Sequence, residues 1–294
     1  TFADNDHNVS DIFDTVTVIG LGGYDTTVNY TASGISVTVN EITLQGNVVD
    51  GYIQGGFVYA DADDDGTFDT GVEANDTTGF DGEFDLGAGV TGTLYLTGGV
   101  DVSTGLAFEG VLSAPEGSTV ITPLTTLVQG LIEAGQDQAT AIANVKALLG
   151  IVATTENILT YDPVAGTKNS ETDGVAIMRA GVKLQNVLAQ VTATLLGASA
   201  ALAADAVFKA AVAAMASEIN SGSLTSLSNA TDIEDLINAA AALPLAGLSG
   251  SEQTAVANVA ADISTVIVGM VGEADGATGT GTTFLENIAK IGVV

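Results

Sequence analysis

The residues of this sequence that are best suited to chemistry are carboxylates gathered in one short segment, YADADDDGTFDTGVE, residues 59–73. Five aspartates fall within nine residues, and no lysine or arginine lies near them in the sequence. Like charges at this density destabilise a folded chain unless water solvates them or a cation joins them. A cation-binding loop and a solvated acidic loop are therefore the two interpretations of this segment.

The spacing of the acids is typical of a calcium loop, because they alternate along the chain and Gly66 allows a sharp bend after them. Calcium takes six to eight oxygen ligands at flexible geometry, and carboxylates at alternate positions of a turning loop converge on one point. The predicted Ca²⁺ ligands are Asp61, Asp63, Asp65, the backbone carbonyl of Thr67, Asp69 (directly or through water) and Glu73.

The segment departs from an EF-hand in two ways. Position 12 of the loop, which holds a bidentate glutamate in an EF-hand, is Val72, and Glu73 comes one residue later. The flanking residues also have the alternation of strands rather than the spacing of helices. Asp76 and Asp81 are therefore alternative further ligands, and the solvated hairpin loop stays open as the second interpretation.

Composition indicates a folded protein with an acidic surface. The 294 residues are 46% apolar and 14% charged, with a formal net charge of -30 and no cysteine. That apolar content excludes a disordered acidic tail, and the length favours two domains over one. Disulfides contribute nothing to the fold.

Charge also limits the partners. Residues 1–145 carry 22 acidic residues and no lysine or arginine. Nucleic acid and anionic membrane surfaces are disfavoured, since both need clustered basic residues. Cations, other copies of this chain and an uncharged glycan or protein receptor remain. We expect no membrane span, because the most apolar segment, residues 255–272, contains Asn258 and Asp262 and is predicted to be a buried amphipathic helix.

The first part of the chain has the pattern of β-structure. In GISVTVNEITL, Ile35, Val37 and Val39 share one face, and short β-branched runs separated by glycine continue to residue 118. We predict an antiparallel β-sandwich over residues 46–118. Residues 1–45 are either an integral strand pair or a protruding strand-rich arm, and the sequence does not decide between these alternatives.

Helical spacing begins after residue 119. Thr122 is placed to cap a helix that Pro123 starts and Gly135 ends, and a second helix is predicted over Asp137–Leu149. Longer alanine-rich helices are predicted near 171–197, 199–220, 231–243 and 250–272. The predicted fold class is thus α+β, with a β-sandwich followed by a helical bundle domain over residues 119–294.

Nothing in the sequence favours an enzyme. His7, the only histidine in the sequence, lies near the N-terminal end, where a catalytic base is not expected. Cysteine and a G-x-S-x-G motif are absent. The GLGGYD segment, residues 20–25, is predicted to be a glycine turn rather than a nucleotide loop. Glycoside hydrolysis by paired carboxylates is the remaining enzymatic hypothesis, and the absence of tryptophan argues against it.

The order of several motifs resembles a module of large bacterial surface proteins and adhesins. The segment from GYIQGGFVYADADDDG to DGEFDL precedes VITPLTTLVQGLIEAG and then LTYDPVAG, within residues 50–166. In that family an acidic loop in a small β-sandwich precedes a helical PLTTL segment. This sequence differs in having Val72 before the glutamate and Gly79 before the second turn.

The resemblance implies secretion, calcium in the loop and a structural or adhesive role. Our first hypothesis is a secreted, calcium-stabilised subunit of an extracellular filament, matrix or surface layer that assembles with itself by strand donation. The alternative is a module of a large adhesin that binds a glycan or protein receptor. Either one predicts an extracellular or cell-surface location and no catalysis.

Overall fold

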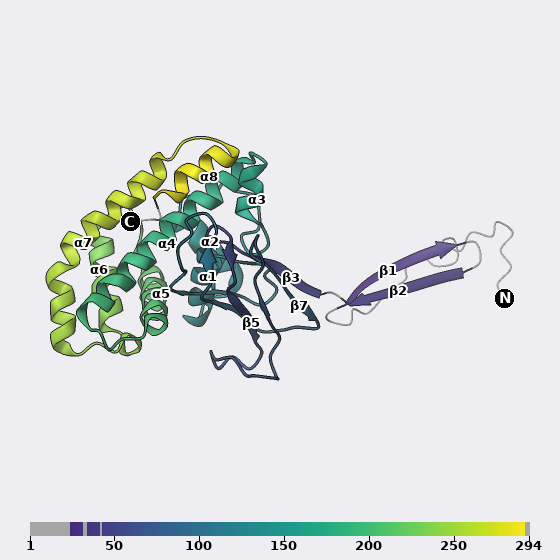
Figure 1. Cartoon of the computed structure of the whole chain (residues 1–294), viewed down its shortest axis with the longest axis horizontal. Helices are drawn as coiled ribbons and strands as arrows, with labels where there is room; N and C mark the ends of the chain where they lie inside the picture. The colour runs from purple at the N-terminus through teal and green to yellow at the C-terminus, as the bar shows by residue number, and fades with distance from the viewer. Residues whose placement is uncertain (1–23, 32–33, 42, 292–294) are drawn as a thin grey trace.

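A computed structural model of the protein describes residues 24–31, 34–41 and 43–291, and in it the strands precede the helices (Figure 1). The predicted α+β class is confirmed. The strands are β1 (Tyr24–Thr31), β2 (Gly34–Glu41), β3 (Thr43–Val48), β4 (Ile53–Gln54), β5 (Phe57–Asp61), β6 (Asn75–Thr77), β7 (Glu83–Ala88), β8 (Thr93–Thr97), β9 (Val100–Asp101), β10 (Val111–Ala114) and β11 (Val120–Ile121).

The strands β1 and β2 form a two-stranded antiparallel hairpin with an unbroken register from Tyr24 opposite Glu41 to Thr31 opposite Gly34. This hairpin projects away from the rest of the protein (Figure 1). Within the described residues neither strand pairs with a strand of the body. The first 23 residues, which include His7 and most of the GLGGYD segment predicted to be a glycine turn, lie outside the described residues.

Two small sheets follow the hairpin. One is antiparallel and has the order β10-β8-β5-β6, and the other has the order β11-β3-β7. Val58 and Leu96 of the first sheet and Phe84 of the second belong to one cluster of buried residues. The strands β4 and β9 form a further short pair.

One strand pair differs from the predicted antiparallel arrangement. The strand β11 runs parallel to β3, with Val120 beside Asn47 and Ile121 beside Val48. Alternation of apolar residues identifies the buried face of a strand but not the direction of its neighbour, so the sequence could not reveal this pairing.

The helices are α1 (Pro123–Glu133), α2 (Gln138–Leu148), α3 (Pro163–Lys168), α4 (Thr172–Ala198), α5 (Ala204–Ser221), α6 (Ala230–Ala242), α7 (Gly250–Gly276) and α8 (Gly281–Ala289). The predicted Thr122 cap and Pro123 start of α1 are present, and Thr122 and Thr125 form a reciprocal capping box. The helix α5 begins five residues later than predicted, after Ser199 leaves α4 in an extended conformation. The helices α3 and α8 were not predicted.

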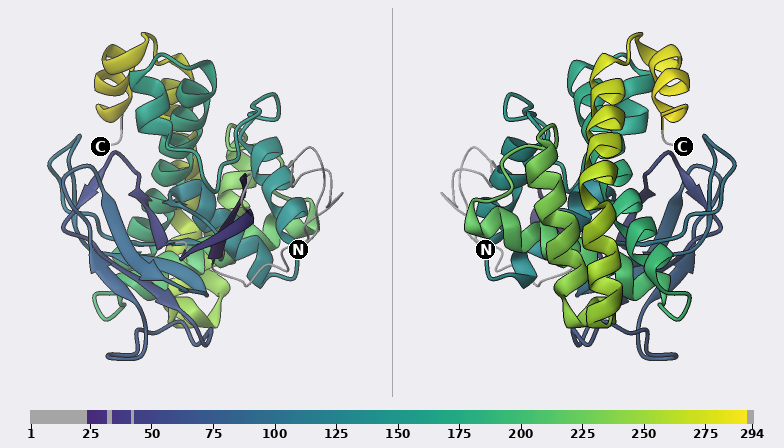
Figure 2. Two further views of the ribbon diagram at one scale, coloured as in Figure 1. Left: turned by 90° about the vertical axis from the view of Figure 1, so that its right-hand side faces the viewer. Right: turned by 90° about the vertical axis from the view of Figure 1, so that its left-hand side faces the viewer.

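The main cluster of buried apolar residues runs from the sheets into the helices. It joins Leu94 of β8 and Leu112 of β10 to Leu127 of α1, Leu188 of α4 and Ile237 of α6. The helices lie together on one side of the sheets, with α6 and α7 on the outer surface (Figures 1 and 2). The sheets and the helices therefore hold each other in place, and both help to position the loops between them.

The helix α7 is, within the described residues, the one helix long and apolar enough to cross a membrane. A core helix of a soluble protein passes the same test of length and composition, so this is weak evidence for a span. One of its faces contacts other helices through Val256, Ile267 and Val271, which are buried. The expectation that it does not span a membrane stays a prediction.

Candidate metal site in the acidic loop

The acidic loop leaves the end of β5 and returns to β6, its neighbour in the four-stranded sheet. Carboxylate oxygens of Asp61, Asp63 and Asp65 lie within 4.8 Å of one another. Asp61 is the last residue of β5 and is 1% exposed, whereas Asp63 and Asp65 are open to solvent. The structure thus brings together three of the six predicted ligands, one anchored in the sheet and two on the loop.

Two left-handed residues bend the loop back over Asp61. Asp64 has φ 64° and Gly66 has φ 78°. Glycine reaches this region without steric cost, and aspartate is one of the few other residues that tolerate it. The bend lets the Asp61 carboxylate accept the backbone N–H groups of Gly66 at 2.8 Å and of Asp65 at 3.3 Å.

Thr67 contributes to the loop through Asp65. Its backbone N–H and its hydroxyl donate to the Asp65 Oδ1 at 2.8 and 2.6 Å. These two bonds lower the pKa of Asp65, the bond from the hydroxyl having the larger effect. The Asp65 side chain is therefore held in place and ionised before any cation arrives.

Glu73 closes the loop and is not one of the grouped acids. Its two carboxylate oxygens accept the backbone N–H groups of Ala62 at 2.9 Å and Asp69 at 3.0 Å, and the residue is 6% exposed. The preceding residue, Val72, is 81% exposed in a turn stabilised by a bond from its N–H to the Asp69 carbonyl. Val72 is the residue that this loop has in addition to an EF-hand loop. It precedes a glutamate that fastens the two ends of the loop together.

An aromatic cluster anchors the middle of the loop to the sheet. Phe68 lies edge-on to Phe57 with ring centroids 4.9 Å apart and is 5.5 Å from the ring of Tyr59. Tyr59 in turn stacks on Tyr95 at 5.4 Å. These rings belong to a small apolar cluster that is separate from the main core. The loop therefore packs against the face of the sheet that points away from the main core.

The charges of the loop affect the groups around it. Partial removal from water and the adjacent charge of Asp65 raise the pKa of Asp63. Burial, followed by the negative charges of Asp61 and Glu73, raises the pKa of Tyr59 to about 12. A cation among the three aspartates would lower this accumulated negative potential.

Asp69, Asp76 and Asp81 are not members of the three-residue group. The Asp69 charge nevertheless contributes to the raised pKa of Asp63. Asp76 accepts the backbone N–H groups of Thr77 and Asp85, each at 2.8 Å, and so ties β6 to β7. Of the alternative ligands suggested by the sequence, Asp76 thus has structural partners outside the loop.

Sequence reasoning missed a basic residue of α5 that contacts the loop. Lys209 of α5 lies 143 positions from Gly66, and its Nζ is 3.4 Å from the Gly66 carbonyl oxygen. The same ammonium is 5.3 Å from the centre of the Tyr95 ring. Such a contact between a helix and a distant loop leaves no signal in the local sequence.

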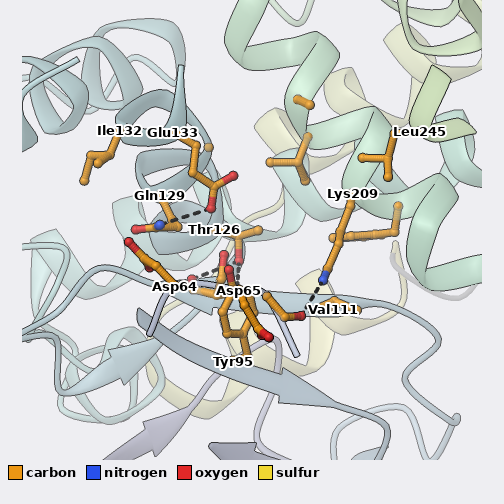
Figure 3. A pocket seen from close by; sticks show the side chains of 16 residues that line it. Asp64, Asp65, Tyr95, Val111, Thr126, Gln129, Ile132, Glu133, Lys209 and Leu245 are labelled. Atoms are coloured by element: carbon orange, nitrogen blue, oxygen red, sulfur yellow. Dashed lines mark hydrogen bonds between the residues drawn. The ribbon is translucent and has the colours of Figure 1, made fainter. Parts of the chain in front are cut away.

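A pocket of about 470 Å³ adjoins the loop (Figure 3). Asp64 and Asp65 of the loop border it from below in this view, Gln129 and Glu133 of α1 from the upper left, and Lys209 of α5 from the right. The Gln129 amide donates to Glu133 at 3.0 Å, which links the polar groups of the α1 wall. The pocket thus places hydrogen-bonding groups beside the candidate metal ligands.

No family model, curated protein or solved structure matches this chain. The resemblance to modules of bacterial surface proteins stays a prediction. The three aspartates could hold a metal ion, and this conclusion rests on their geometry alone.

Proposed function

We propose that the protein is a secreted structural protein, a subunit of an extracellular filament, matrix or surface layer, which assembles by strand donation and is stabilised by calcium. The observation that carries this proposal is the β1–β2 hairpin, which projects from the body and pairs with no other strand within the described residues. An unpaired strand edge is a template for a strand of another chain, and a head-to-tail contact of this kind need not close. Repetition of the contact would produce a filament.

The choice of calcium rests on ligand chemistry. Carboxylate oxygens that converge from one loop suit a hard cation with a large coordination sphere, and solvent-exposed Asp63 and Asp65 leave room for water ligands. Neutralisation of the loop would also reduce repulsion between subunits that each carry a net charge of -30.

Assembly is tested with a substitution in the hairpin of the full chain. Val28 and Val37 are opposite each other in the register. Replacing both by proline removes two backbone donors and disrupts the strands, whereas replacing both by threonine keeps β propensity. In calcium, negative-stain micrographs should show polymers for the parent chain and the threonine variant but not for the proline variant. Polymers of the folded proline variant, or a monomeric parent chain at high concentration, would contradict strand donation.

The calcium site is tested by thermal unfolding. A chelator should lower the Tm of the parent chain, because a ligand that binds only the native state stabilises it. The response should be weaker when Asp63 and Asp65 are both changed to asparagine. A matched control changes two exposed acids elsewhere, Glu116→Gln with Asp262→Asn, and should retain the full response. Equal melting curves in calcium and chelator at moderate salt would leave only the solvated loop.

The pocket beside the loop favours one second candidate, a module of an adhesin that binds a glycan or protein receptor. Its lining combines the ring of Tyr95 with polar groups of Gln129, Glu133 and Lys209, a combination suited to hydroxyl-bearing ligands. Saturable binding of a glycan by a chain that stays monomeric in calcium would favour this candidate over the filament.

A further inference from the structure

A second cavity, of about 240 Å³, lies between the Asp50–Gly51 turn, the segment that follows β9, and the helices α4 and α8. It shares no lining residue with the pocket beside the acidic loop. At this volume the cavity suits a small molecule or a single chemical group rather than a large ligand.

Asp50 presents a carboxylate to this cavity without a partner. It occupies a two-residue turn, since Val49 and Tyr52 on either side form a bridge and Gly51 has φ 76°. Asp50 is partly buried, and no described group donates a hydrogen bond or forms an ion pair with it. A carboxylate in this state is costly in a folded protein unless a ligand or a proton neutralises it.

The other acidic residues of the cavity do not neutralise the charge of Asp50. The turn lies so close to Asp101 that a side chain at Gly51 would collide with the Asp101 carboxylate. Asp101 already accepts the N–H and the hydroxyl of Ser103, each at 2.7 Å, while Glu109 adds a third negative group. No lysine, arginine or histidine is among the described lining residues. The cavity therefore selects against anions and in favour of a cation.

The helix α4 supplies polar atoms that lack partners. Met178, Val182 and Asn186, at four-residue spacing on one helix face, line the cavity. Asn186 is 5% exposed, and its Nδ2 has no hydrogen-bond partner; the Oε1 of Gln185 also lacks one. Both atoms are closed to solvent, so a ligand reaches them only when the two amide side chains turn toward the cavity, and it then recovers the free energy that an unpartnered buried donor and acceptor cost.

These groups together define a ligand. Asp50 and the Gln185 oxygen both require a donor, which an ammonium group supplies with its charge, and the Asn186 amide requires a neutral acceptor. Phe108, Val182 and Ile288 add apolar surface for the carbon atoms between those two groups. We infer that this cavity binds a small amino alcohol, either free or as an amino sugar unit, through Asp50, Gln185 and Asn186.

Burial, and to a lesser extent the charge of Asp101, raises the pKa of Asp50 to about 8. A bound ammonium stabilises the ionised carboxylate, so binding is coupled to loss of a proton. The affinity for an amine that stays protonated should rise from about pH 6 to about pH 8 and then level off.

The test is a calorimetric titration of the full chain with ethanolamine at pH 8, which does not depend on metal binding or assembly. We expect saturable binding of ethanolamine, weaker binding of ethylamine, which lacks the hydroxyl, and no binding of ethylene glycol, which lacks the ammonium. Glucosamine and glucose form a second pair that distinguishes an amino sugar unit from a free amino alcohol. Glucosamine binding tighter than ethanolamine would identify the sugar as the preferred source, and the reverse would identify the free amino alcohol.

Two substitutions and a control assign the binding to the cavity. Asp50→Asn removes the charge without adding volume and should weaken ethanolamine binding about tenfold or more. Asn186→Leu should weaken ethanolamine but leave ethylamine unchanged, while Asp262→Asn on the exposed face of α7 should change neither. Equal affinity for ethanolamine in the Asp50→Asn and Asp262→Asn variants, or equal affinity of the parent chain for ethylene glycol and ethanolamine, would overturn the assignment.

Discussion

The acidic loop and the cavity at Asp50 handle carboxylates in opposite ways. In the loop, Asp61 accepts two backbone N–H groups and Asp65 accepts two bonds from Thr67, so clustered charges are held by local donors. At Asp50 a partly buried carboxylate lies beside Asp101 without a hydrogen-bond donor among the described residues. The pKa of Asp65 is lowered and that of Asp50 is raised, to about 8.

This difference shows that the number of neighbouring acids does not determine how a carboxylate behaves. The two donors from Thr67 lower the pKa of Asp65 in the crowded loop, whereas burial, with a smaller contribution from the charge of Asp101, raises the pKa of Asp50. Asp65 can therefore offer a charge to a cation without losing a proton at neutral pH, whereas Asp50 would lose a proton as an ammonium group binds.

The largest effect is expected at Glu73, which holds both ends of the loop. Glu73→Gln keeps the shape of the side chain but presents an N–H₂ group to one of two buried backbone donors, so the variant should lose about 2–3 kcal/mol of unfolding free energy. Urea unfolding in chelator measures this loss without a contribution from metal. Glu116→Gln, at an exposed position, is the matched control and should change the stability by less than about 0.5 kcal/mol. An equally small change in both variants would mean that Glu73 does not fasten the loop.

An effect of opposite sign is expected at Asp50. In the folded protein the pKa of Asp50 is about 8, above the unfolded value of about 3.9, so the folded state favours the protonated carboxyl group. The free energy of unfolding is therefore highest below about pH 4 and falls as the pH rises toward 8. Asp50→Asn should therefore stabilise the protein by about 2 kcal/mol at pH 8 and have little effect near pH 4. Urea unfolding across this range measures the difference, and a constant difference or a destabilised variant at pH 8 would contradict the account of Asp50.

The smallest effect is expected at Phe68, which packs against the sheet from the loop. Phe68→Ala should cost about 1 kcal/mol, because the ring is only partly buried and its contacts are with two other aromatic rings. Phe80, which is 61% exposed, provides the control, since Phe80→Ala removes the same atoms without comparable packing. If both variants unfold alike, the aromatic cluster does not anchor the loop.

The elements with strong local signals could be predicted from the sequence. Thr122 and Pro123 mark the start of α1, and the aspartates at alternate positions indicate the loop. The positions of α3 and α8 were not predicted, although Asp162 before Pro163 is a capping signal of the same kind, because both helices are short. The parallel direction of β11 depends on a partner more than 70 residues away, which no local pattern specifies.

The candidate site was predictable only where local spacing determines it. The grouping of Asp61, Asp63 and Asp65 follows from their spacing, while the role of Glu73 as a clasp depends on the path of the backbone. The contacts of Lys209 and the isolation of Asp50 come from helices far along the chain. Local chemistry therefore predicted the grouping of three aspartates, and tertiary packing decided their surroundings.

The most direct test of the account is a calorimetric titration of Ca²⁺ into the full chain at moderate salt, alongside a variant with Asp61→Asn and Asp65→Asn. The three grouped carboxylates predict one saturable site per chain in the parent protein and its loss in the variant, while Glu116→Gln with Asp262→Asn leaves it intact. The same binding in parent and loop variant, or no saturable binding in the parent, would contradict a calcium site in this loop.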